Sequence, residues 1–275
     1  MITIKNLEFS YKDNRVLDNI SLQLEEGRIY GLLGENGVGK TTLLTLLCGL
    51  KRVQNGSITI DGIEPSKRLP QSLADQYYLP DEVASMSITA KRYAKDFGKF
   101  WYKFDFQKFM KLMDIFENDP NKRMDKMSNG ELKKAYISFA LACNTKYLYL
   151  DEPTNGLDIP SKAQFRKAVS QFTREDSVLV ISTHQVRDLE NIIDPIIILD
   201  RRDVLLNASI DRIAEKLFFD YSGIPADNAL YSELLPGSSI QVRPNTSNLE
   251  SKVNVEALFN TVHLHKNYIK GLFDK

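Results

Sequence analysis

Residues 34–41 read Gly34-Glu35-Asn36-Gly37-Val38-Gly39-Lys40-Thr41 and match the phosphate-loop pattern G-x-x-x-x-G-K-[ST] at every fixed position. The apolar residues 29–33 just before this stretch predict a buried strand, and residues 42–47 just after it predict a helix. Strand, glycine-rich loop and helix together turn backbone N–H groups and the positive end of a helix dipole toward a polyphosphate. In that arrangement Lys40 is expected to reach the β- and γ-phosphates, and the Thr41 hydroxyl to bind Mg²⁺.

Composition limits the class of protein. The chain has 275 residues, 43% of them hydrophobic, and 36 basic residues balance 36 acidic ones. Such a chain buries a sizeable core, and its zero net charge gives no overall attraction to nucleic acid or to an anionic membrane. No apolar run approaches the ~18 residues of a membrane helix, and the N-terminus lacks a signal-peptide pattern. Cys48 and Cys143 lie in apolar stretches, so we expect buried thiols in a reducing cytoplasm.

The N-terminal part predicts antiparallel strands. Apolar residues alternate within residues 2–24, with a polar turn at residues 12–15 between the two halves. A third strand is expected at residues 57–60, and Asp61-Gly62 directly after it favours a tight hairpin. Another short strand is expected at residues 77–79. This part therefore combines an antiparallel β subdomain with the phosphate-binding strand and helix.

A helical region follows. Residues 89–117 are helical in character and dense in aromatic residues. Two alternatives are open: a small helical subdomain packs these rings into its own interior, or some of them form an exposed groove for a partner. Both can hold at once. Further on, Ser128 is followed three residues later by Glu131, which is a capping box and predicts a helix that begins at Ser128.

Continuous apolar runs alternate with helix-like segments in the next part, a pattern typical of a parallel sheet covered on both faces. The first run ends in Asp151-Glu152, so two carboxylates are expected at the carboxyl edge of the sheet, where open α/β sheets bind ligands. The three apolar runs are residues 147–150, 178–181 and 196–199, and a helix-like segment near residues 186–193 separates the second run from the third.

The pattern changes after residue 207. We expect one short helix near residues 211–219, followed by turns at Pro225, Pro236-Gly237 and Pro244. Residues 208–275 are therefore a candidate accessory extension.

Four short motifs follow the phosphate loop in a fixed order, and the set resembles that of the ATP-binding cassette (ABC) ATPases over roughly residues 2–207. Met127-Ser128-Asn129-Gly130-Glu131 is similar to the signature motif, usually Leu-Ser-Gly-Gly-Gln, and Leu150-Asp151-Glu152 is similar to the end of the Walker B motif. Asn155-Gly156-Leu157-Asp158 resembles the D-loop, and Thr183-His184 resembles the switch histidine. The resemblance implies an α/β fold of the P-loop NTPase type, with a mostly parallel core sheet flanked by helices, an N-terminal antiparallel β subdomain and an α-helical subdomain at about residues 82–142.

Phosphoryl transfer needs a cation clamp, a metal and a group that orients water. The resemblance implies that Lys40 and the loop amides hold the phosphates of ATP, while Thr41 and Asp151 hold Mg²⁺ directly or through water. Glu152 would polarise the attacking water, and His184 would contact the γ-phosphate and that water.

Other matched positions imply a second molecule. Ser128 and Gly130 would bind the γ-phosphate of an ATP held by a second ABC ATPase subunit, either identical or related, so ATP would join two subunits. The remaining implied nucleotide-binding residues are Tyr11, which would stack on adenine, Thr42 and Asp158.

The chain departs from the family pattern at several positions. Asn129 and Glu131 replace the usual glycine and glutamine of the signature motif. Asp81 stands where the family carries a glutamine, and its carboxylate can still coordinate Mg²⁺, although it adds a charge. His263 and His265 form an H-x-H pair without further ligands nearby, so we do not expect a metal site there.

We therefore expect the ATP-hydrolysing subunit of an ABC transporter, with the cassette at residues 1–207 and the extension at residues 208–275. It would lie at the inner face of the cell membrane, bound to a separate integral membrane permease, and no nucleic acid is expected as a partner. The alternative is a soluble ABC ATPase that acts on nucleic acid or ribosomes. Neither the substrate nor the direction of transport can be predicted.

Overall fold

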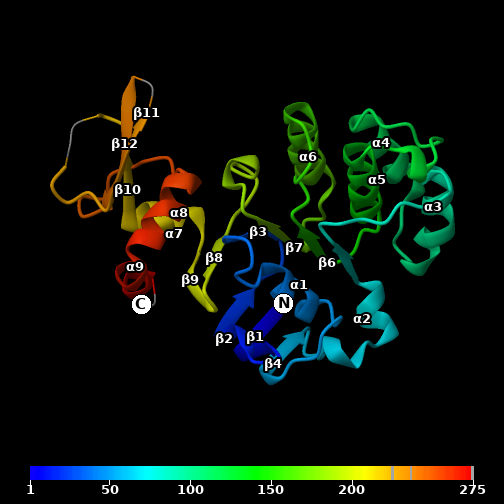
Figure 1. Cartoon of the computed structure of the whole chain (residues 1–275), viewed down its shortest axis with the longest axis horizontal. Helices are drawn as coiled ribbons and strands as arrows, with labels where there is room; N and C mark the ends of the chain where they lie inside the picture. Colours follow the sequence, from blue (N-terminus) through cyan, green and yellow to red (C-terminus); the bar gives the residue numbers. More distant parts are fainter. Residues whose placement is uncertain (224–225, 236, 274–275) are drawn as a thin grey trace.

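The computed structural model describes residues 1–223, 226–235 and 237–273. Its main sheet has six strands in the order β5-β6-β7-β3-β8-β9 (Figure 1). Neighbouring strands run parallel except β8 and β9, which are antiparallel. The predicted mostly parallel α/β core is thus confirmed. The strands are β3 (Arg28–Leu33), β5 (Gln76–Leu79), β6 (Tyr147–Asp151), β7 (Val178–Thr183), β8 (Ile196–Asp200) and β9 (Asp203–Ala208).

A separate antiparallel sheet forms at the N-terminus, in the order β2-β1-β4. Its strands are β1 (Ile2–Tyr11), β2 (Asn14–Leu24) and β4 (Asn55–Ile60). Asp61 and Gly62 have positive φ angles of 48° and 79°, as a tight turn requires. The turn is present, but the described residues after it form no second hairpin strand. Ile63 makes only an isolated bridge to Ile60 before the chain enters a 3₁₀ turn, η1 (Pro65–Lys67).

Two cores cover the two faces of the main sheet. Side chains alternate between the faces of a strand. On β6, Tyr147 and Tyr149 pack with the N-terminal sheet and with α1 (Lys40–Leu47), while Leu148 and Leu150 pack on the other face. The helix that follows the phosphate loop is therefore fixed between two sheets.

The aromatic region forms a helical subdomain beside β5 (Figure 1). Phe139 is fully buried, and the rings of Tyr77, Tyr93, Trp101 and Phe104 lie within 5.7 Å of its ring, centroid to centroid. Most of the aromatic residues thus pack inward, whereas Phe100 and Tyr102 are 63% and 65% exposed. The helical elements here are α2 (Pro70–Ala74), α3 (Ala90–Phe97), η2 (Gly98–Phe100), α4 (Phe106–Ile115), η3 (Met124–Lys126) and α5 (Asn129–Ala142).

Two predictions after β7 need correction. The helix-like segment at residues 186–193 contains only a 3₁₀ turn, η4 (Val186–Asp188), because Asn191 adopts a positive φ of 84° that no continuous helix allows. The helix expected near residues 211–219 ends earlier: α7 (Ile210–Lys216) gives way to strand β10 (Leu217–Asp220). Between β6 and β7 lies α6 (Ile159–Phe172).

The C-terminal region forms a small antiparallel sheet in the order β10-β12-β11, with two helices. Its buried residues belong to the same core as one face of the main sheet, and Lys266 and Lys270 pair with Asp200 and Asp203. The turns predicted at Pro225 and Pro236 fall outside the described residues. The elements are β11 (Tyr231–Leu235), β12 (Ser238–Pro244), α8 (Val255–Leu264) and α9 (Lys266–Phe273).

Within the described residues, no helix is long and apolar enough to cross a membrane.

Candidate nucleotide-binding site

The loop at residues 34–41 joins β3 to α1 at the carboxyl edge of the main sheet. Gly39 has a φ of 113°, and a β-carbon at this position would lie 3.0 Å from the side chains of both Val16 and Leu17. Only glycine fits this backbone. Because α1 begins at Lys40, the loop leads directly into a helix N-terminus, which favours an anion.

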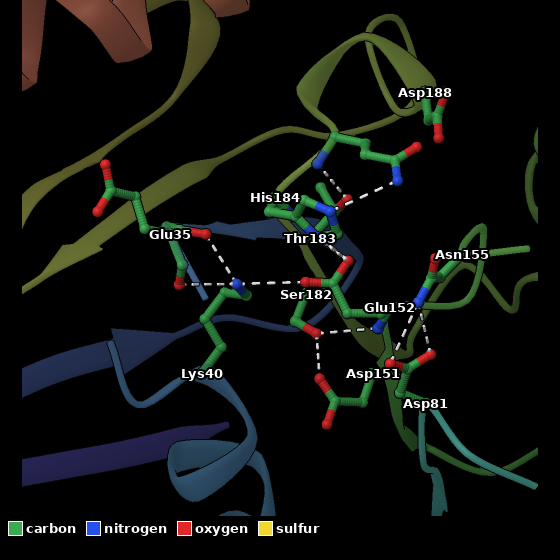
Figure 2. Close-up of polar contacts among 12 residues, drawn as sticks. Glu35, Lys40, Asp81, Asp151, Glu152, Asn155, Ser182, Thr183, His184 and Asp188 are labelled. Carbon is green, nitrogen blue, oxygen red and sulfur yellow. Dashed lines mark hydrogen bonds and ion pairs between the residues drawn. The ribbon is translucent and has the colours of Figure 1, made fainter. Parts of the chain in front are cut away.

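Lys40 lies inside the loop with its side chain 5% exposed. Its Nζ atom donates to the carbonyl oxygens of Gly34 at 2.7 Å and Glu35 at 3.1 Å, and lies 3.2 Å from Glu152 Oε1 (Figure 2). The buried ammonium is therefore paired with a carboxylate from β6. This arrangement keeps a positive charge at the centre of the site.

Three hydroxyl groups hold the carboxylate of Asp151. Thr41 donates to Oδ2 at 2.6 Å, Tyr78 donates to the same oxygen at 3.1 Å, and Ser182 makes a close hydrogen bond to Oδ1. Burial, followed by the negative charge of Asp151, raises the pKa of Tyr78, so its phenol remains a donor. Sequence motifs missed both Tyr78 and Ser182; their only local signal was a hydroxyl-bearing side chain near the carboxyl end of a strand.

Thr41 and Asp151 fit a magnesium site, because a threonine hydroxyl and a carboxylate meeting at a helix N-terminus are the hard oxygen ligands that Mg²⁺ binds. The Thr41 hydroxyl and the Asp151 carboxylate are held side by side by their own hydrogen bond.

Glu152 follows Asp151 in a left-handed conformation, with a φ of 45°. Its N–H donates to the Ser182 carbonyl oxygen and lies 3.1 Å from the Ser182 hydroxyl. Its Oε2 atom lies 3.0 Å from His184 Nδ1 and accepts from the His184 backbone N–H at 3.3 Å (Figure 2). Gln185 Nε2 lies 3.5 Å from the other ring nitrogen. The structure thus brings Lys40, Glu152 and His184 into one chain of polar contacts.

Seven of the predicted nucleotide-binding residues line a cavity of about 380 Å³ beside this cluster. Tyr11 stands at its edge, 44% exposed, with its hydroxyl 3.3 Å from the Thr42 hydroxyl and Lys51 Nζ 4.8 Å from its ring centre. Gly34, Glu35 and Val38 are not among the lining residues, and Val38 is buried in the core instead. The lining residues are Tyr11, Asn14, Val16, Asn36, Gly37, Gly39, Lys40, Thr41, Thr42, Asp81 and Glu152.

The signature and D-loop residues do not line this cavity. Ser128 and Glu131 form the predicted capping box at the start of α5. A β-carbon on Gly130 would lie 3.6 Å from the Gly156 carbonyl oxygen, so the signature faces the D-loop of its own chain. Asp158 caps α6 by accepting from the Ser161 N–H at 2.9 Å.

Other candidate ligands have ordinary structural roles. Cys48 and Cys143 are buried free thiols as predicted, and burial raises the pKa of Cys48 to about 11. His265 Nε2 lies 2.7 Å from the Leu230 carbonyl oxygen, and His263 Nε2 lies 3.8 Å from Asp200 Oδ1. In the described part of the chain, no group of three or more His, Cys, Asp or Glu residues could hold a metal.

Comparisons with known proteins agree with this geometry. Residues 17–155, half of the chain, match the family described as ABC transporter. AlbC of Bacillus subtilis (strain 168), an ABC transporter ATP-binding protein, is 32% identical over 202 residues, 70% of this chain and 84% of that protein. YtrB of the same organism, also an ABC transporter ATP-binding protein, is 28% identical over 218 residues, 78% of this chain and 74% of that protein.

A solved structure has the same fold. The ATP-binding cassette MJ0796, in a dimeric post-hydrolysis state bound to ADP and Pi, superimposes with a TM-score of 0.68 at 21% identity, covering 76% of this chain and 98% of that one. The family match favours the transporter prediction over the nucleic-acid alternative. The sequence match agrees with the phosphate loop, the two carboxylates and the histidine described above. The chain therefore belongs to the ABC transporter family and is one of its ATP-binding and ATP-hydrolysing subunits.

Proposed function

We propose that the chain binds Mg²⁺-ATP at residues 34–41, hydrolyses it as half of a two-subunit assembly, and thereby powers a separate membrane permease. The observation that carries the proposal is the connected cluster of Lys40, Thr41, Asp151, Glu152 and His184 at the carboxyl edge of the sheet. These residues come from the start of α1, the end of β6 and the segment just after β7, yet each lies within 3.3 Å of another.

The residues divide the chemistry between them. Lys40 and the loop amides bind the phosphates, and the ammonium exchanges its contacts with the Glu152 carboxylate and the loop carbonyls for phosphate oxygens. Thr41 and Asp151 would hold Mg²⁺, whose charge would offset the negative charge that develops on the phosphates. Glu152, released from Lys40, accepts the proton of the attacking water. His184 holds the carboxylate in place through Nδ1, and its other ring nitrogen, 3.5 Å from Gln185 Nε2, would contact the γ-phosphate or the water.

A second subunit completes the site in this proposal. Ser128 and Gly130 lie at a helix N-terminus, which suits phosphate, but within one chain they do not line the nucleotide cavity. Tyr11 would stack on the adenine ring, and Asp158 would contact the partner across the interface. The partner is either a second copy of this chain or a related ATPase subunit.

The second part of the proposal concerns the membrane permease as a partner. The relatives are named as transporter subunits, among them a zinc uptake protein and a methionine import protein, and these cargoes are properties of those proteins. For this chain we propose a peripheral position on the inner face of the membrane. Co-expression with a candidate permease and co-purification in detergent tests it; consistent failure to co-purify contradicts the transport role.

The test of the chemistry is Glu152→Gln. The variant keeps the shape of the side chain but cannot accept a proton, so we expect ATP binding to persist while turnover falls by at least 10²-fold, a typical contribution of a general base. An ATP-dependent dimer should accumulate in gel filtration. Glu215→Gln, an exposed change on α7, is the matched control and should match the wild type. Unchanged turnover in Glu152→Gln would remove this residue from the role of base.

A further inference from the structure

Asp81 carries the most marked departure of this chain from the family motifs, and its carboxylate is already paired. Its Oδ1 atom lies 3.0 Å from Lys133 Nζ, which also makes a close hydrogen bond to the Asp81 carbonyl oxygen. Asn155 Nδ2 lies 3.3 Å from each carboxylate oxygen (Figure 2). The contact thus joins three segments: the loop after β5, the helix α5 and the turn after β6.

Lys133 depends on this contact more than Asp81 does. The lysine side chain is 5% exposed, whereas that of Asp81 is 40% exposed. A buried ammonium is tolerated when it is paired and hydrogen-bonded. Among the residues that the structure describes, Asp81 supplies the only carboxylate within 4.0 Å of Lys133 Nζ. The acidic residue at position 81 and the buried lysine at position 133 therefore belong together.

Asp81 also faces the nucleotide cavity. It lines the cavity that contains Lys40, Thr41 and Glu152, and it lines a neighbouring cavity of about 430 Å³ together with Lys133. One carboxylate therefore stands between the nucleotide loop and the helix that begins at the signature motif. A cation held by Thr41 and Asp151 attracts this carboxylate, and so does Lys133.

We propose that Lys133 is a positioning residue that holds the Asp81 carboxylate on the α5 side of the nucleotide cavity. The Mg²⁺ ion of bound Mg²⁺-ATP and the Lys133 ammonium then compete for this carboxylate. This inference rests on the proposed function, because it requires Mg²⁺-ATP at residues 34–41. Removing the lysine charge frees Asp81 for the cation. ATP affinity then rises in the presence of Mg²⁺ and does not rise in its absence, because the unpaired carboxylate then only repels the phosphates.

The experiment measures nucleotide affinity, not turnover. A fluorescent, non-hydrolysable ATP analogue is titrated into the full chain in Mg²⁺ and again in EDTA, and the ratio of the two affinities is compared between variants. Lys133→Met keeps the length of the side chain and should raise the ratio by about fivefold or more, the range of ordinary coupling between sites. Adding Asp81→Asn to Lys133→Met should abolish the gain.

Two controls keep the test decisive. Lys134→Met changes the neighbouring lysine of the same helix and should leave the ratio at the wild-type value, because among the described residues only Lys133, and not Lys134, forms an ion pair with Asp81. If Lys133→Met does not fold, Lys133→Gln gives the same comparison, because its amide can still donate to the Asp81 carbonyl oxygen.

The outcomes separate the two proposals. A ratio in Lys133→Met within about twofold of the wild type lies below the usual range of coupling and overturns the role of the ion pair. An equal rise with Asp81→Asn present also overturns it, because the gain then does not come from that carboxylate. A wild-type chain that binds no nucleotide in either buffer refutes the proposed function itself.

Discussion

Tyr78 tests how firmly the structure holds Asp151. Its hydroxyl is one of the three that donate to this carboxylate, and it reaches Oδ2 at 3.1 Å from the strand β5. Burial and the charge of Asp151 raise its pKa, so the phenol stays protonated and donating throughout the neutral range. Tyr78→Phe removes this hydrogen bond and keeps the ring and its packing.

The magnitude follows from the charge of the acceptor. A hydrogen bond to an ionised group contributes about 1.5–3 kcal/mol, and because two hydroxyls remain on Asp151 we expect the lower end, about 1.5 kcal/mol. For a chain of this size each kcal/mol shifts Tm by roughly 2–4 °C, so Tyr78→Phe should lower Tm by about 3–6 °C. Differential scanning calorimetry of the nucleotide-free chain measures this shift.

A matched surface change provides the comparison. Tyr102 donates to Asp75 Oδ1 at 2.7 Å but is 65% exposed, so water replaces the lost bond in Tyr102→Phe and the change should stay within about 0.5 kcal/mol. If both variants lower Tm equally, or Tyr78→Phe leaves it unchanged, the argument that Tyr78 supports the Asp151 carboxylate is refuted.

Two further predictions concern the fold. Phe139→Ala empties the centre of the aromatic cluster and should cost about 3–5 kcal/mol in urea unfolding, whereas Phe100→Ala on the surface should cost far less; similar values would mean that the cluster does not stabilise the subdomain. Burial lowers the pKa of Lys108 from 10.5 to about 8, so between these values the unfolded chain binds more protons and the free energy of unfolding should rise with pH. In Lys108→Met this rise should be smaller, as urea unfolding across the pH series measures, and an identical pH profile would contradict the burial argument.

The parts of the site that sequence predicted are those encoded by adjacent residues. The phosphate loop, the capping box at Ser128 and the strand end at Asp151 each depend on a few consecutive positions, whose local conformation follows from their own chemistry. The roles of Lys40, Glu152 and His184 followed from motif order alone, and their mutual contacts needed the three-dimensional arrangement of β3, β6 and β7.

The rest was hidden because it depends on residues far apart in the chain. Tyr78 reaches Asp151 across 73 positions, and Lys133 reaches Asp81 across 52, so no local pattern reveals either pair. Sequence reasoning assigned Asp81 to the metal and did not consider a buried lysine as its partner. The helix predicted at residues 186–193 was wrong for a similar reason. Its apolar residues have the spacing of one helix face, but in the structure they pack into the core around a single 3₁₀ turn.

The antiparallel strand β9 has a practical consequence for work on this chain. It forms the last strand of the main sheet, and α9 is tied to it by the ion pair between Lys270 and Asp203. Leu206 and Ala208 share their core with the C-terminal elements. A chain that ends at residue 207 would lack the C-terminal elements that pack on β9. The apolar side chains of β9 would then be exposed, and the shortened chain would be prone to self-association and proteolysis. Separating the extension's contribution from that of the cassette therefore calls for surface substitutions in α8 and α9, not for deletion.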